Sequence, residues 1–306
     1  MKNKVQFQKG FSLIEFMKHY GTEEQCRKAL FQWRWPQGYV CPECGGSSYC
    51  TLKTRAVYQC NRCHYQHSLI SGTIFSATKL PLTLWFLAIH LITQAKTGIS
   101  ALSLRRQLGI SYNTAWSIKH KLMQVMKERD DSQPLSGIIQ LDDVYWGGEQ
   151  RGGKRGRGSP NKTAFVAAVS VNEKGHPMAM AMNVVDGFRS KEIAKWAQRH
   201  LCADSVVVSD GLACFAAVSE AGCQHTAIVT GGGPACVSME TFTWVNTMIS
   251  NVKRSINERI TLFITNICHA IWQSFVIAST GALSLKICSP AYVTLPPERH
   301  LCLCGY

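Results

Sequence analysis

The sequence is poor in acidic residues. Its 306 residues include 19 Asp and Glu against 33 Lys and Arg, which gives a formal net charge of +14. A protein with this balance attracts polyanions, so nucleic acid or another anionic surface is the expected partner. Hydrophobic residues make up 46% of the chain, and its length allows two or three modules with cores of their own.

Two kinds of hydrophobic segment are also missing. The opening residues, MKNKVQFQKG, contain no apolar stretch of the kind found in signal peptides. The longest apolar runs are interrupted by polar residues, so we expect no membrane-spanning helix and no membrane partner. The 14 cysteines are therefore expected to be reduced, in a cytosol, with some of them binding metal.

Two Cys-x-x-Cys pairs stand fifteen residues apart in the first part of the chain. Cys41 and Cys44 form the first pair, and Cys60 and Cys63 form the second. Each pair can direct two thiolates from a tight turn at one ion, and four thiolates complete a tetrahedral zinc site. The intervening residues are typical of a small hairpin. We therefore expect a structural zinc ribbon, with four unrelated core cysteines as the alternative.

The residues around these pairs complete a first module at 1–78. Residues 11–32 predict two short helices, and Thr22 with Gln25 forms a candidate capping box for the second. His64 and His67 follow the last cysteine, and we expect them at the surface or facing DNA rather than as zinc ligands.

A helical period follows over residues 79–130. Apolar residues from Leu84 to Ile92 share one face, and glycine-containing breaks near 98 and 109 separate three helices. A short turn followed by a longer helix with polar first turns predicts a helix-turn-helix-like DNA-binding module, with an ordinary three-helix bundle as the alternative. The expected DNA contacts on the longer helix are Asn113, Lys119 and Lys121.

Residues 137–257 predict a third module that mixes strands and helices. Strands are expected at 138–145, 163–172 and 177–185, followed by a helix in SKEIAKWAQRHL, a buried strand in SVVVSD and a further helix in TFTWVNTMISNVKRSIN. This order is RNase-H-like, so the expected fold is multidomain α+β with a mixed sheet in the last module. Asp142 lies on the first strand and Asp210 ends the fourth. Alternation places Asp142 on one face and Asp143 on the other, where Asp143 is expected to be structural.

A basic, glycine-rich run, GGEQRGGKRGRGSPNK, follows the first strand. It is not a P-loop, because Arg stands where Ser or Thr is required and the following Gly-Arg-Gly-Ser-Pro cannot open a helix. We expect a loop that contacts the DNA backbone. Its candidate contacts are Arg151, Lys154, Arg155 and Arg157.

Four segments together resemble a known family. LDDVYWGG is similar to a V-D-E-x-Y-x-G-G strand, SDGLACF to a D-G-x-x-x-Y/F turn, and WVNTMISNVKR to the helix that carries the third catalytic position. KTGISALSLRRQLGISYNTAWSIKHKL matches the helical segment of the same family. These segments identify the chain as resembling insertion-sequence transposases of the ISXO type, which carry an N-terminal zinc ribbon and a DDE-type core. The similarity covers roughly residues 10–257.

The resemblance implies a DNA transposase and its site residues. In some members Asn replaces the third acid, so the implied catalytic set is Asp142, Asp210, Asn246 and Lys253. Asp142 would bridge two Mg²⁺ ions, Asp210 would hold one, Asn246 would offer an amide oxygen to the other and Lys253 would contact a phosphate. Glu240 is the rival third ligand.

The implied partners are the DNA of the element's ends and of the target, on which the protein acts as a homo-oligomer. The implied reaction cleaves the element's ends and joins the freed 3′-OH to target DNA. The alternative is a non-catalytic DNA-binding protein with a zinc ribbon and a helix-turn-helix, either a regulator or a decayed transposase.

The resemblance stops at Asn257. Related transposases continue with a segment similar to G-T-Y-H and then P-R-Y-L-A-E-F-x-Y-R-F-N-R-R. Reading the codons of residues 268–275 from their third base permits Met-Pro-Arg-Tyr-Leu-Ala-Glu-Phe, and Trp272 forces the Ala. We therefore interpret residues 258–306 as a frameshifted, non-native tail, caused by a single-base deletion just after codon 257, that leaves this copy impaired.

Overall fold

The computed structural model describes residues 11–52, 54–95, 98–147, 162–229 and 240–257. These residues form two compact units, one made mainly of residues 11–125 and one of residues 126–257. The predicted frameshifted tail and most of the basic loop lie outside the described residues. The predicted domain boundaries stay predictions.

The first unit opens with two capped helices, α1 (Leu13–Tyr20) and α2 (Glu23–Arg34). The predicted box at the start of α2 is present: the backbone N–H of Gln25 donates to the Thr22 hydroxyl, and the Thr22 N–H donates to the Gln25 side-chain oxygen. This exchange satisfies two N–H groups that have no partner inside the helix.

A small antiparallel sheet follows, in the order β1 (Tyr49–Leu52), β2 (Val57–Cys60) and β3 (Gln66–Ser68). Three short strands bury little apolar surface, and the rings of Trp35, Tyr39 and Tyr58 pack together beside them. A sheet of this size needs a further source of stability, which a bound metal can supply.

The three predicted helices of the next segment are α3 (Leu82–Gln94), α4 (Ala101–Leu108) and α5 (Tyr112–Asp131). Ser100 caps α4 by accepting the N–H of Ser103, and Gly109 ends it at φ +66°. Glycine adopts this left-handed conformation without a steric penalty, and so the chain turns within three residues into α5. Among the described residues no helix has both the length and the apolar character needed to cross a bilayer.

The second unit is built on a five-stranded mixed sheet in the order β6-β5-β4-β7-β8. β4 (Ile138–Trp146), β5 (Thr163–Val171) and β6 (Pro177–Val184) are antiparallel neighbours. After α6 (Ser190–His200), β7 (Val206–Ser209) returns parallel to β4. The predicted multidomain α+β fold with a mixed sheet is confirmed.

The remaining elements follow β7. The segment η2 (Ala213–Ala221) leads to β8 (Gln224–Ala227), which extends the sheet parallel to β7. The sequence reading missed β8, since QHTA has no apolar alternation. Finally, η3 (Glu240–Phe242) leads into α8 (Thr243–Asn257).

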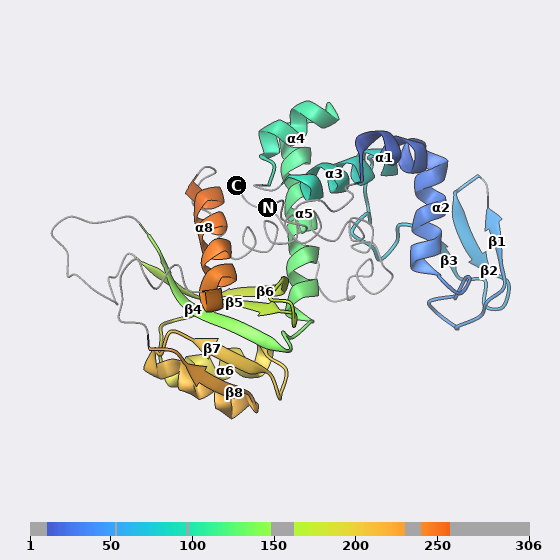
Figure 1. The fold of residues 1–306 in the computed structure, drawn as a ribbon. Helices are drawn as coiled ribbons and strands as arrows, with labels where there is room; N and C mark the ends of the chain where they lie inside the picture. The colour runs from blue at the N-terminus through green and yellow to red at the C-terminus, as the bar shows by residue number, and fades with distance from the viewer. Residues whose placement is uncertain (1–10, 53, 96–97, 148–161, 230–239, 258–306) are drawn as a thin grey trace. The chain divides into compact units, whose positions relative to one another are not determined.

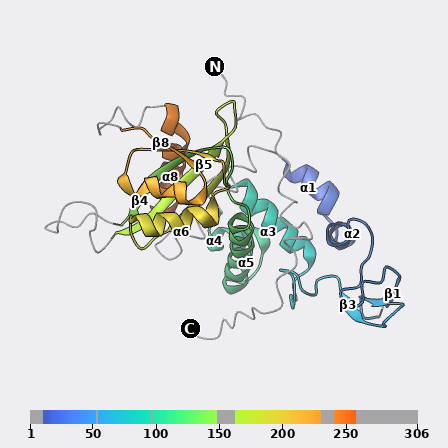
Figure 2. The same ribbon diagram turned by 90° about the horizontal axis from the view of Figure 1, so that it is seen from below.

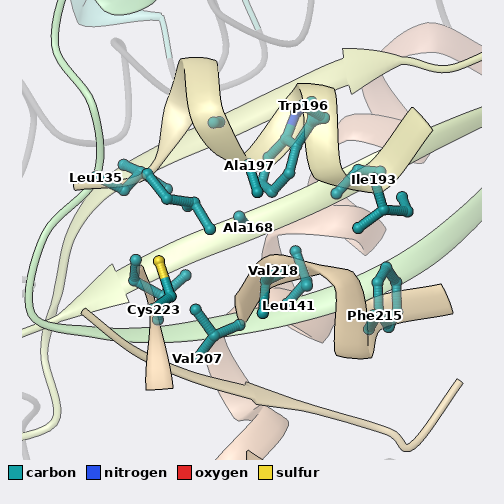
Figure 3. Close-up of a cluster of buried hydrophobic side chains, with 14 of the residues drawn as sticks. Leu135, Leu141, Ala168, Ile193, Trp196, Ala197, Val207, Phe215, Val218 and Cys223 are labelled. Carbon is teal, nitrogen blue, oxygen red and sulfur yellow. The ribbon is translucent and has the colours of Figure 1, made fainter. Parts of the chain in front are cut away.

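The sheet buries both of its faces. On one face Leu141 and Val207 pack against Ile193 and Trp196 of α6 and against η2 (Figure 3). On the other face Val144 packs in a second cluster with residues of α8. Figures 1 and 2 show α6 and α8 on opposite sides of this sheet. Residues of β4 therefore alternate between an α6 face and an α8 face.

Candidate functional site

Asp142 and Asp210 lie side by side where two parallel strands end. β4 pairs with β7 from Ile138↔Val206 to Leu141↔Ser209, so the next residue along each strand is an aspartate. One carboxylate oxygen from each lies within 4.8 Å of the other. The carboxyl ends of parallel strands are the usual position for ligand-binding side chains in open sheets. The structure thus brings together the two acids expected to bind Mg²⁺.

Gln140 connects this edge to α8. Its buried side-chain oxygen accepts the backbone N–H groups of Trp244 at 3.2 Å and Val245 at 3.1 Å. These N–H groups belong to the first turn of α8, where no intrahelical partner exists. Gln140 therefore fixes the start of α8 two residues from Asp142 along β4. Sequence reasoning missed this residue, although a polar side chain within a buried strand was the available signal.

Asn246 and Lys253 lie on α8 beside its buried stripe. Val245, Met248 and Val252 are buried against the sheet, and Asn246 and Lys253 are half-buried at its edge, two helical turns apart. The positive charge of Lys253 acts on the Asp142 carboxylate. Glu240 lies in η3, immediately before α8. The assignment of Asn246 as the third ligand stays a prediction.

The electrostatics of Asp142 are unusual. Burial, followed by the negative charges of Asp143 and Asp210, raises the pKa of this carboxyl from 3.8 to about 7, while Lys253 opposes the shift. A negative charge is thus unfavourable here without a cation. A divalent cation would offset both causes, and the carboxylate oxygens are donors that Mg²⁺ prefers. The residues present therefore fit a Mg²⁺ site.

Asp143 joins the two expected acids in one cluster, although the alternation of β4 places it on the opposite face, as expected. Its carboxylate offers an oxygen within 4.8 Å of those of Asp142 and Asp210, and its backbone N–H donates to Asp142 Oδ1 at 2.8 Å. The pairing with β7 stops at Leu141, whereas β5 continues beside Asp143 as far as Trp146. Among the described residues no strand lies beside Asp143 on the β7 side, so its carboxylate can approach those of Asp142 and Asp210 although its strand position faces the other way.

A tight turn positions Asp210. Gly211 adopts φ +86°, and the N–H of Leu212 donates to Asp210 Oδ1 at 3.1 Å. Behind the turn, the Ser209 hydroxyl contacts His225 Nε2 at 2.9 Å and accepts the Gly211 N–H at 3.4 Å. A side chain at residue 211 would be strained by this backbone conformation. The Asp-Gly pair thus holds the carboxylate at the end of β7.

The four predicted zinc ligands come together at one point of the small sheet. The sulfur atoms of Cys41, Cys44, Cys60 and Cys63 all lie within 4.8 Å of one another. Two of the Sγ–Sγ distances, Cys41–Cys63 and Cys44–Cys60, are 3.6 Å. A tetrahedral site with Zn–S bonds of about 2.3 Å requires about 3.8 Å between sulfurs. The arrangement is therefore preformed for zinc.

The protein also stabilises a thiolate at this point. Burial acts to raise the pKa of Cys41, but hydrogen bonds from the Cys44 and Glu43 backbone and from neighbouring thiols lower it to about 6. The Arg62 N–H similarly donates to Cys60 Sγ at 3.4 Å. Zinc binds the thiolate form, so these backbone donors favour metal binding.

His67 is not at the surface, contrary to expectation. It pairs with Tyr58 across the β2–β3 ladder, is 5% exposed and lies 5.6 Å from each of the Trp35 and Tyr39 rings, between centroids. Burial lowers the pKa of its ring, so it belongs to the aromatic core beside the zinc ligands. His64 is exposed, as expected.

The predicted DNA contacts divide between described and undescribed residues. Arg151, Lys154, Arg155 and Arg157 lie outside the described residues. On α5, Asn113 and Lys121 are exposed and Lys119 is half-buried. The sequence from Cys44 to Lys127 contains ten Lys and Arg and no Asp or Glu. Such a long stretch without acids provides a surface suited to a polyanion.

Comparisons with known proteins agree with these features. A model of the transposase zinc-ribbon domain matches residues 21–66, and a model of the ISXO2-like transposase domain matches residues 134–260. A curated relative, an uncharacterized protein in transposable element ISH50 of Halobacterium salinarum, is 26% identical over 133 residues, which cover 42% of this chain and 44% of that protein. The chain thus spans less than half the length of this relative.

A solved structure, a pre-cleavage Mos1 transpososome, is 7% identical with a TM-score of 0.24. The match covers 65% of this chain and 76% of the other.

Proposed function

Because the chain belongs to the insertion-sequence transposases that join a zinc ribbon to an ISXO2-like transposase domain, we propose that it cleaves the ends of its element and joins them to target DNA. The observation that carries this proposal is the pairing of β4 with β7, which sets Asp142 beside Asp210. Two half-buried carboxylates with a lysine acting on one of them form a site suited to a divalent cation and a phosphodiester.

Each residue of the site has a role in this proposal. Divalent cations, when bound, would supply charge stabilisation at the phosphodiester oxygens. Asp142 and Asp210 would hold them. Asn246 offers its amide oxygen, and Lys253 contacts a phosphate of the strand being cleaved. The raised pKa of Asp142 means that its carboxyl must lose a proton before it binds metal.

DNA binding is assigned to the remaining modules. The ribbon at 1–78, the helical module at 79–130 and the basic loop hold the ends and target through their cations, and a homo-oligomer assembles on the DNA of the bacterial nucleoid. Charge complementarity supports this assignment, since residues 44–127 contain no acid.

A competing function is a DNA-binding protein that does not cleave. Two features favour it: an amide at Asn246, where the family resemblance implies a third acid that only some members replace by Asn, and the change of composition after Asn257. An amide carries no charge, so metal affinity at that position is lower than with Glu.

The proposed frameshift bears directly on this choice. The transposase-domain match ends at residue 260, close to where the resemblance of the motifs stops. Inserting one base after codon 257 should restore the R-Y-L-A-E-F segment and give a more soluble and more active protein. If no such insertion restores it, the frameshift proposal is wrong.

The test uses both chains. Each is mixed with a duplex carrying the DNA that flanks the gene, with and without Mg²⁺, and nicking and strand transfer are measured. Mg²⁺-dependent nicking by the repaired chain supports the transposase. Binding without nicking by both chains supports the non-catalytic alternative.

A further inference from the structure

The start of α5 carries an exposed row of rings. Tyr112, Trp116 and His120 are spaced four residues apart, so they follow one another along a single face of the helix. Tyr112 is 45% exposed and Trp116 is 42% exposed. Ring centroids are 6.1 Å apart for Tyr112–Trp116 and 4.3 Å apart for Trp116–His120. We call these three residues the aromatic row.

The aromatic row is not part of the core. The buried side of this part of α5 is formed by Ala115, Ile118 and Leu122, which lie on another face of the helix. Burying two large rings would normally stabilise a protein, because each contributes a large apolar area. Here both rings keep more than two fifths of their surface in contact with solvent, which indicates a binding surface.

The surroundings of the aromatic row are cationic. Lys119 lies beside His120 on the same helix, Arg105 and Arg106 are exposed on α4, just before α5, and the segment from residue 44 to 127 contains no acid. Burial and the charge of Lys119 both lower the pKa of His120, which favours the neutral ring that can stack as an aromatic. Flat rings within a positive field are what binds unpaired bases of a nucleic acid.

We propose that the aromatic row stacks on unpaired DNA bases, so that the helical module binds single-stranded DNA as well as duplex. In a duplex the base faces are covered by their neighbours, and only the edges are open to side chains such as Asn, Lys and Arg. The exposed faces of aromatic rings can instead stack on the faces of bases that are unpaired and no longer stacked in a duplex. The inference rests on the proposed function, in which nicking at the element's ends frees a strand.

The experiment compares Trp116→Leu with Trp116→Phe in the full chain. Anisotropy measures binding to a mixed-sequence single-stranded oligonucleotide and to a blunt duplex of the same sequence, without Mg²⁺. Because Trp116→Leu loses stacking on one base, its affinity for the single strand should fall by about tenfold or more. Trp116→Phe should bind it nearly as the original chain does. Both variants should bind the duplex within about twofold of the original chain, as expected for a surface change.

Controls separate this effect from simpler ones. Zinc content and thermal unfolding should match among the variants, since Trp116 is exposed. Lys119→Ala should weaken binding to both probes and lower the salt dependence. Unchanged single-strand affinity in Trp116→Leu, or equal losses on both probes, overturns the proposal. A change in the oligomeric state of Trp116→Leu without DNA also overturns the proposal, because that result would mean that the aromatic row forms a contact between copies of the chain.

The outcome does not depend on catalysis. A chain that never nicks DNA can still show the difference between the two probes. Conversely, an active transposase whose Trp116→Leu variant binds single strands normally would leave the proposed function intact and refute only the stacking.

Discussion

The cysteine cluster and the aspartate cluster are both candidate metal sites, yet they are assembled in different ways. The four cysteines lie within 23 consecutive residues of one small hairpin, so their spacing alone predicts the site. Asp142 and Asp210 are brought together by the pairing of two parallel strands, and α8 is tied to them by Gln140. The first cluster depends on local turns, whereas the second depends on the whole sheet.

The largest expected effect concerns the aspartates. Asp142→Ala or Asp210→Ala should reduce Mg²⁺-dependent cleavage by the repaired chain about a thousandfold or more, since metal clamping contributes several kcal/mol to the transition state. Duplex affinity should hardly change, because DNA binding is assigned to other modules. Gel-based cleavage and binding assays measure the two effects. An equal loss of both would mean that the aspartates are structural.

Removing one cysteine tests the local site. Cys60→Ser should abolish zinc binding and unfold the ribbon, because three short strands have little core of their own. Zinc analysis and hydrogen exchange measure this, with Cys50→Ser, at an exposed cysteine in β1, as the matched control. We expect the sheet of the second unit to keep its protection. Retention of zinc by Cys60→Ser would contradict the four-thiolate site.

Gln140→Leu tests the connection between β4 and α8. It leaves the N–H groups of Trp244 and Val245 without their acceptor, which should lower the free energy of unfolding by about 1–3 kcal/mol. Cleavage should fall as well, since α8 carries Asn246 and Lys253. Urea unfolding gives the first value, and Gln107→Leu, on the exposed surface of α4, should change it little. An unchanged free energy of unfolding in Gln140→Leu would show that the hydrogen bonds from Trp244 and Val245 to Gln140 do not stabilise the fold.

The raised pKa of Asp142 predicts a pH dependence. Between its ordinary value of 3.8 and about 7 the folded state holds a proton that the unfolded state has released, so the stability of the metal-free chain falls as pH rises through this window. Asp142→Asn should remove that fall. Thermal unfolding at several pH values without divalent metal measures it. An identical slope in the variant would mean that another group titrates.

The smallest expected change is Asn246→Asp. A carboxylate in place of the amide should tighten Mg²⁺ binding by up to about tenfold if residue 246 is a ligand. Calorimetry measures the affinity, and Asn251→Asp, elsewhere on α8, serves as the control. No change in affinity would remove Asn246 from the ligand set and favour a carboxylate such as Asp143.

These contrasts also explain what the sequence could predict. The cysteine site, four of the five strands of the sheet and the Asp142–Asp210 pair follow from spacing, periodicity and the family resemblance. Gln140 and Asp143 do not follow from those patterns. The role of a buried polar residue on a strand becomes visible only when α8 is placed against it, and the proximity of the Asp143 carboxylate to the other two acids depends on where the pairing of β7 stops. His67 was predicted at the surface because its neighbours in the sequence are polar, whereas packing against the rings of Trp35 and Tyr39 buries it.

The most direct test of the aspartate site is metal binding itself. Mn²⁺, used as a paramagnetic substitute for Mg²⁺, is titrated into the zinc-loaded full chain and followed by electron paramagnetic resonance, alongside a variant carrying both Asp142→Ala and Asp210→Ala. The account predicts saturable Mn²⁺ binding that strengthens from pH 6 to pH 8 and is lost in the variant, while zinc content and duplex binding stay the same. Equal Mn²⁺ binding by the two proteins would contradict it.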